Sequence, residues 1–137
     1  MKRISILLML LLASTDVMAA NWVGVAVSEG DGGNKVEFFY DSESLKISSH
    51  FRYAWTKASS QKKIEHGVGA ESNKIVDYVV TKVLYDCDGE TSRPMAMNWH
   101  YTDGSLHQTD VRSVAPAPVE PDTVGYLVLK AVCAIKR

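Results

Sequence analysis

The sequence has little cysteine and little net charge. It contains two cysteines among 137 residues, and its formal net charge at pH 7 is −1. Proteins that hold nucleic acid by electrostatic attraction need a strongly basic surface, so this balance argues against that class of partner. Two cysteines without a Cys-x-x-Cys motif likewise argue against a structural zinc site.

The short motifs of common enzyme active sites are also missing. The chain has no Gly-x-Ser-x-Gly nucleophile elbow, no phosphate-binding P-loop and no His-Glu-x-x-His zinc motif. We therefore expect a protein that is not an enzyme and that uses no cofactor.

The one long apolar run lies at the N-terminus. A basic start precedes the nearly unbroken apolar stretch Ile4–Leu12, and the small residues Ala19 and Ala20 follow. This order is typical of a bacterial secretory signal peptide. The run is too short to cross a bilayer, which takes about 20 residues. We predict a signal peptide over residues 1–20, a single domain over residues 21–137, and no transmembrane segment after cleavage.

The predicted export affects the expected redox state of the two cysteines, Cys87 and Cys133. In an oxidising compartment, two cysteines of a small domain usually pair. A bridge across a loop of this length stabilises the fold by about 4 kcal/mol. Free thiols and an intermolecular bridge are the alternatives. Because no cysteine lies near the cleavage site, we expect a periplasmic, secreted or cell-surface protein without a lipid anchor.

Most of the domain has the patterns of β-strands. Alternating or continuous apolar residues are bounded by clusters of Gly, Asp, Ser and Pro. Between them, the polar segment Ser59–Asn73 indicates a long connection. Strands are expected over 21–27, 36–41, 45–47, 50–57, 74–87, 95–101 and 106–112.

The C-terminal segment favours a helix. Asp122 or Thr123 can cap its first turn, and a strand over YLVLKAV is the alternative. We expect an α+β fold, an antiparallel meander of about six strands with one C-terminal helix packed on it and tied by a disulfide. The apolar stripe of this helix consists of Val124, Leu127, Val128 and Ala131.

Two histidines form a weak candidate metal pair. If Asp103 and Gly104 make a two-residue hairpin loop, His100 lies opposite His107, with Cβ atoms about 5 Å apart. Two imidazoles so placed could share Zn²⁺ or Cu²⁺. With no third ligand, two incidental histidines on a solvent-facing hairpin are favoured, and we predict no metal site.

Three other features bear on binding. The aromatic stripe Phe51, Tyr53 and Trp55 is either a binding surface or, as we favour, core beneath the helix. Trp22 lies on a strand expected at a sheet edge, where a second copy or a peptide can add. The basic tip Lys62–Lys63 could contact an acidic partner, although a solvated loop is the simpler interpretation.

Six motifs together resemble a known family. NWV, FFYDSESL, FRYAWTK, VLYDCDG, WHYTDGS and PDTVGYLVLKAVC occur in the order found in the surface-adhesin protein E family. The resemblance covers most of residues 21–137 and implies one antiparallel sheet with a C-terminal helix. It also implies a disulfide between Cys87 and Cys133, and it assigns no ligand-binding residue.

The resemblance implies a function as well. The named member of the family is an outer-membrane adhesin that dimerises and binds host matrix proteins such as vitronectin and laminin. We therefore expect an exported, non-enzymatic protein-binding module with a host extracellular-matrix protein as partner and a homodimer through a sheet edge. The alternative is a soluble periplasmic structural or accessory protein with no host role, which the missing lipid-anchor cysteine favours.

The signal-peptide prediction can be tested by mass spectrometry. When the full chain is expressed in a bacterium, the exported protein should begin at Ala20 or Asn21. Alkylation with and without reductant should show both cysteines oxidised. A full-length chain retained in the cytoplasm would contradict the prediction.

Overall fold

The computed structural model describes residues 19–65 and 73–136. Residues 1–18 of the expected signal peptide and residues 66–72 of the expected connection lie outside the described residues. Among those described, no helix is long and apolar enough to cross a membrane.

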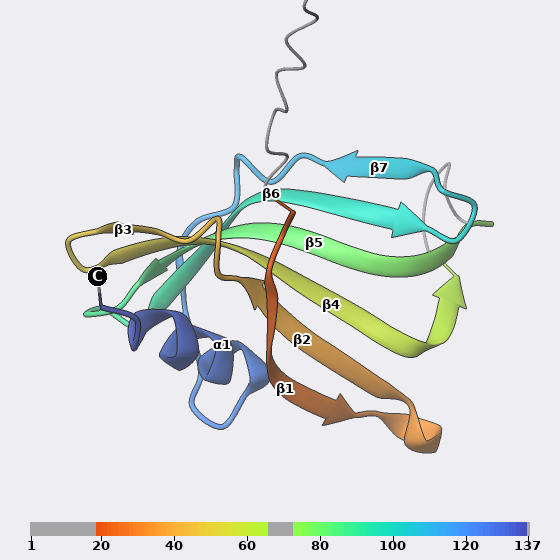
Figure 1. Ribbon diagram of the computed structural model, residues 1–137, viewed down its shortest axis with the longest axis horizontal. Helices are drawn as coiled ribbons and strands as arrows, with labels where there is room; N and C mark the ends of the chain where they lie inside the picture. Colours follow the sequence, from red (N-terminus) through yellow and green to blue (C-terminus); the bar gives the residue numbers. More distant parts are fainter. Residues whose placement is uncertain (1–18, 66–72, 137) are drawn as a thin grey trace, which may run out of the picture.

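The described strands form one antiparallel sheet, shown in Figure 1. Its order is β1-β2-β4-β5-β6-β7, with β3 beside β4 and β8 beside β6. The predicted antiparallel meander with one C-terminal helix is confirmed. The elements are β1 (Trp22–Glu29), the 3-10 helix η1 (Asp31–Gly33), β2 (Lys35–Asp41), β3 (Lys46–Ser48), β4 (Phe51–Glu65), β5 (Ile75–Asp86), β6 (Thr91–Tyr101), β7 (Leu106–Thr109), β8 (Ala117–Pro118) and α1 (Val124–Cys133).

Strand β4 is longer than the sequence predicts. The polar residues that we assigned to a connection, from Ser59 to Glu65, continue the strand. Ser59 and Ser60 pair with β2, and Glu65 pairs with Ile75 of β5 beyond an irregularity in the register. Strand propensity depends strongly on the neighbouring strands. Here two partners hold polar residues in a strand that their composition does not favour.

Helix α1 packs on one face of this sheet, which we call the helix face. Its first turn is capped by Thr123, whose hydroxyl accepts a hydrogen bond from the Tyr126 backbone N–H at 3.2 Å. Leu129 and Val132 have no exposed surface and pack against Ala54, which is 1% exposed. The predicted cap and helix are confirmed, and the core lies between α1 and the central strands.

The aromatic stripe lies on the other face, contrary to our expectation. Alternation along β4 turns Ala54 and the buried Arg52 toward α1. Phe51, Tyr53 and Trp55 therefore point away from the helix and are half-buried. Alternation separates the two sets of side chains but does not say which set the helix will cover. A small residue such as Ala54 lets the helix approach the sheet closely.

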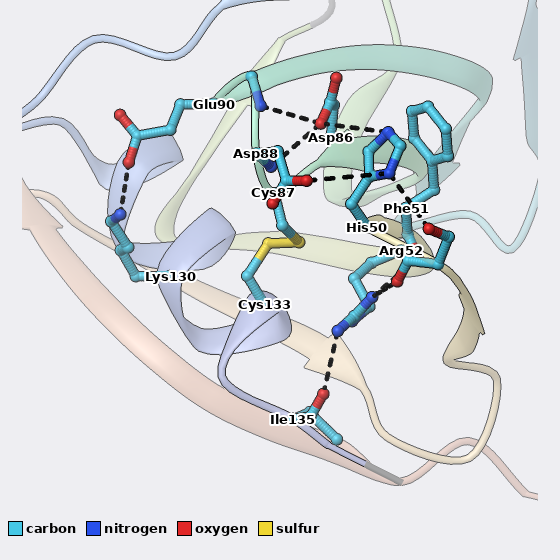
Figure 2. Close-up of a disulfide and its surroundings, with 12 residues drawn as sticks. His50, Phe51, Arg52, Asp86, Cys87, Asp88, Glu90, Lys130, Cys133 and Ile135 are labelled. Atoms are coloured by element: carbon cyan, nitrogen blue, oxygen red, sulfur yellow. Dashed lines mark hydrogen bonds and ion pairs between the residues drawn. A yellow bond between two sulfur atoms is a disulfide. The ribbon is translucent and has the colours of Figure 1, made fainter.

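The C-terminal helix is tied to the sheet by a disulfide. Cys87, directly after β5, is bonded to Cys133 at the end of α1, with Cα atoms 5.7 Å apart (Figure 2). The structure thus contains the intramolecular bridge rather than two free thiols. Arg52 adds a second tie, because its guanidinium donates to the carbonyl oxygens of Ser49 at 2.9 Å and Ile135 at 3.4 Å.

A third tie joins the middle of α1 to the turn before β6. The carboxylate of Glu90 accepts hydrogen bonds from the Lys130 ammonium and, at 3.3 Å, from the Tyr126 hydroxyl (Figure 2 shows the Lys130 contact). The bond from Lys130 holds the pKa of Glu90 below its ordinary value. The Glu90 backbone carbonyl also accepts from the Val119 N–H at 2.9 Å, which fixes the segment that leads into the helix.

We predict that Cys133→Ser lowers the melting temperature by about 15 °C, because it removes a loop constraint worth about 4 kcal/mol. Thermal denaturation followed by circular dichroism measures the change. Cys87→Ser is the matched control and should have the same effect, since either substitution removes the same bond. An unchanged melting curve in both variants would contradict the prediction.

Candidate functional site

The loop between β6 and β7 is one residue longer than predicted. The Tyr101 N–H donates to the Ser105 carbonyl at 3.1 Å, so three residues, 102–104, lie between the paired ends. Gly104 adopts a left-handed conformation with φ of 83°, and the Asp103 carboxylate accepts from the Ser105 N–H at 2.8 Å. Glycine in this conformation is common at the end of a three-residue hairpin loop.

The longer loop separates the two histidines. His100 pairs with Leu106, and His107 pairs with Trp99. Because adjacent residues of a strand point to opposite faces, the two imidazoles lie on opposite sides of the sheet. The predicted pairing of His100 with His107 is therefore wrong. Within residues 19–65 and 73–136, no group of three or more histidine, cysteine, aspartate or glutamate residues could hold a metal ion.

The basic tip is part of strand β4. Lys62 and Lys63 belong to the long β4, and the Lys63 ammonium lies 2.6 Å from a carboxylate oxygen of Asp77 on β5. This ion pair compensates one of the two positive charges that we assigned to an exposed tip. The segment therefore offers a weaker attraction for an acidic partner than its composition indicates.

The sheet face away from α1, which we call the open face, carries a lysine among aromatic rings. The Lys57 ammonium lies 4.6 Å from the centre of the Phe39 ring, 4.8 Å from Trp22 and 5.9 Å from Tyr78. Tyr78 in turn stacks on His100, with ring centres 4.3 Å apart. We call these five side chains the cation–aromatic cluster. Attraction between the ammonium and the ring faces holds them together.

The cluster is assembled by the register of five neighbouring strands. Phe39 of β2 pairs with Lys57 of β4, and Tyr78 of β5 pairs with His100 of β6. Gly24 of β1 pairs with Phe39, and a Cβ atom at Gly24 would lie 3.7 Å from the Phe39 ring. This is an ordinary van der Waals distance, so the Phe39 ring lies directly over the edge strand at Gly24.

The rest of the open face also combines cationic and aromatic side chains. The Lys82 ammonium lies 6.0 Å from the centre of the Trp55 ring. Lys46 pairs with Tyr53, and Arg93 pairs with Leu84 on the adjacent strands. Cationic and aromatic side chains thus alternate over the face, with carboxylates at Glu37 and Asp86. Aromatic residues and arginine are enriched where proteins bind each other.

Residues far apart in the sequence form this surface, which explains why sequence reasoning missed it. Continuing the alternation of the aromatic stripe by one step would have added Lys57 to it. Trp22, Phe39 and Tyr78 come from three other strands, and their position beside Lys57 depends on registers that alternation cannot supply. The expectation that Trp22 lies on an edge strand is confirmed, because β1 begins the sheet order.

A disulfide-tied helix on one face of an antiparallel sheet, with an aromatic and cationic surface on the other, defines a small α+β domain. The chain belongs to the surface-adhesin protein E family, whose model matches residues 22–134. A search of curated proteins found no match.

Solved structures of Haemophilus influenzae protein E have a similar fold. Crystal form II is 16% identical, with a TM-score of 0.57 over 71% of this chain and 80% of that chain. Protein E from non-typeable Haemophilus influenzae is 15% identical, with a TM-score of 0.55 over 85% of this chain and 86% of that chain. At this identity the likeness concerns the fold alone.

We predict that Lys57→Met destabilises the domain by about 1 kcal/mol, because three rings lose their contact with the ammonium. The free energy of unfolding in urea measures this change. Lys82→Met is the matched control, since its ammonium lies near one ring only. Equal stability of Lys57→Met and the unmodified protein would show that the contacts do not stabilise the cluster.

Proposed function

We propose that this protein is an exported, non-enzymatic protein-binding module whose open face binds a host extracellular-matrix protein. The observation that carries the proposal is the cation–aromatic cluster, together with Trp55 and Lys82, on the face that α1 leaves uncovered. Membership of a surface-adhesin family supports binding as the activity. The predicted signal peptide, residues 1–20, supports export, and residues 21–137 would then be the mature domain.

The chemistry of the open face indicates the partner surface that it suits. Aromatic rings supply large apolar contact area, and the lysines Lys46, Lys57 and Lys82 favour carboxylates on the partner. Exposed charges are screened by salt, so the association rate should fall as ionic strength rises. A partner with acidic groups beside apolar side chains would match this surface.

Self-association through the β1 edge fits the same proposal. β1 is the outermost strand of the sheet order, and its Val27 is 58% exposed. An edge strand presents backbone donors and acceptors to which a second copy can add. A homodimer formed there would carry two open faces, and simultaneous attachment at both would strengthen binding to an extended matrix protein.

Binding to immobilised vitronectin and laminin tests the proposal. We expect Trp55→Ala and the charge reversal Lys82→Glu each to weaken binding by about tenfold or more, as hot-spot residues do. Leu127→Ala is the matched control, because Leu127 is 51% exposed on α1, on the opposite side of the sheet. It should bind normally. Sedimentation analysis of the same samples reports the oligomeric state.

Fractionation distinguishes the adhesin role from the periplasmic accessory role. Protein at the cell surface or in the medium that binds either matrix protein through the open face would support the proposal. Protein confined to the periplasm, with no affinity for matrix proteins, would overturn it in favour of an envelope-assembly role.

A further inference from the structure

Helix α1 leaves a hollow beside it on the helix face. The helix contacts β1, β2 and β4, and Figure 1 shows it near the end of the sheet where β3 lies. Next to its N-terminal half is a pocket of about 290 Å³. The side chains lining this pocket include Phe38, Thr56, Val79, Tyr85, Val124 and Val128.

A second hollow continues the first along the helix face. It has a volume of about 150 Å³ and is lined by Val36 and Trp99, among others. Ala58 and Val79 line both hollows, so the two adjoin at these side chains. Ala58 is therefore a position at which a larger side chain would reach both hollows. Together they fall within the range of roughly 300–1,000 Å³ that is typical of small-molecule sites.

One polar group in the larger pocket has no partner. Tyr85 is 5% exposed, and its hydroxyl makes no hydrogen bond within the part of the chain that the structure describes. The Thr56 hydroxyl, by contrast, donates to the Thr81 carbonyl at 3.1 Å. The Tyr85 hydroxyl is not among the fully buried polar atoms that lack a partner, so it faces the accessible space of the pocket and is available to a ligand.

The remaining residues that line the larger pocket disfavour a charged ligand. The one charged residue among its lining, Lys57, directs its ammonium to the aromatic rings of the open face. A bound anion would therefore lose its hydration without gaining a counter-ion. Burial also raises the pKa of Tyr85, so the hydroxyl keeps its proton and can donate a hydrogen bond.

We propose that this pocket binds the aliphatic chain of a small, uncharged, lipid-like molecule, whose oxygen accepts a hydrogen bond from the Tyr85 hydroxyl. A dry cavity of about 150 Å³ holds benzene. The larger hollow, at about 290 Å³, therefore has room for a chain of roughly ten carbons. The lining is mostly apolar, which favours an aliphatic chain over ordered water, because an ordered water needs two to four polar partners. This activity is separate from protein binding by the open face.

Calorimetric titration of the full mature chain with 1-hexanol, 1-octanol and 1-decanol tests the proposal. We expect affinity to rise with chain length, because each added methylene buries more apolar surface. Ala58→Ile should fill the junction of the two hollows and weaken 1-decanol binding at least tenfold. Ser59→Ile is the matched control, because it places the same side chain at the adjacent position on the open face, where binding should be unchanged.

Tyr85→Phe tests the hydroxyl without changing the shape of the pocket. It should weaken 1-decanol binding by up to about tenfold, the typical effect of one lost hydrogen bond. NMR of the unmodified protein should show shifts at Val79 and little change at the Trp55 indole. Absence of 1-decanol binding, or equal binding by Ala58→Ile and Ser59→Ile, would overturn the proposal. Trp55→Ala should bind 1-decanol normally, which separates this outcome from failure of the matrix-binding proposal.

Discussion

The attachment of α1 to the end of β5 is the constraint on which the rest of the fold depends. A helix of ten residues is too short to be stable alone in water, so it must be held by packing and by ties to the sheet. The Cys87–Cys133 disulfide holds its C-terminal end, and Leu129 and Val132 bury completely against the sheet. Arg52 reinforces the same corner by hydrogen bonding to the Ile135 carbonyl.

This attachment gives the two faces of the sheet different roles. On the helix face, α1 packs over β1, β2 and β4 and leaves an apolar hollow beside its first turns. On the open face, large side chains pack against each other. The Lys57 ammonium lies among the rings of Trp22, Phe39 and Tyr78. One small domain thus combines a broad amphipathic surface with a partly open apolar pocket.

Much of the architecture could be predicted because it depends on local signals. Alternation located the strands, Thr123 and the apolar stripe located the helix, and an even cysteine count in a chain predicted to be exported indicated the disulfide. The predictions that were wrong depended on non-local pairing. Ser59–Glu65 became a strand because β2 and β5 pair with it. One extra loop residue before β7 moved His107 to the face opposite His100, because strand side chains alternate with a period of two.

The sequence by itself determined most of the elements of this protein and the cysteines that tie the helix to the sheet, and it predicts export. Those properties follow from the composition of the chain, from its hydrophobic periodicity and from short motifs that can be recognised locally. Only the tertiary structure decided which side of β4 the helix covers, which rings surround Lys57 and where an apolar pocket forms. Each of these depends on the register and close packing of strands that are distant in the chain. Local residue patterns do not specify which residue of one strand pairs with which residue of the next.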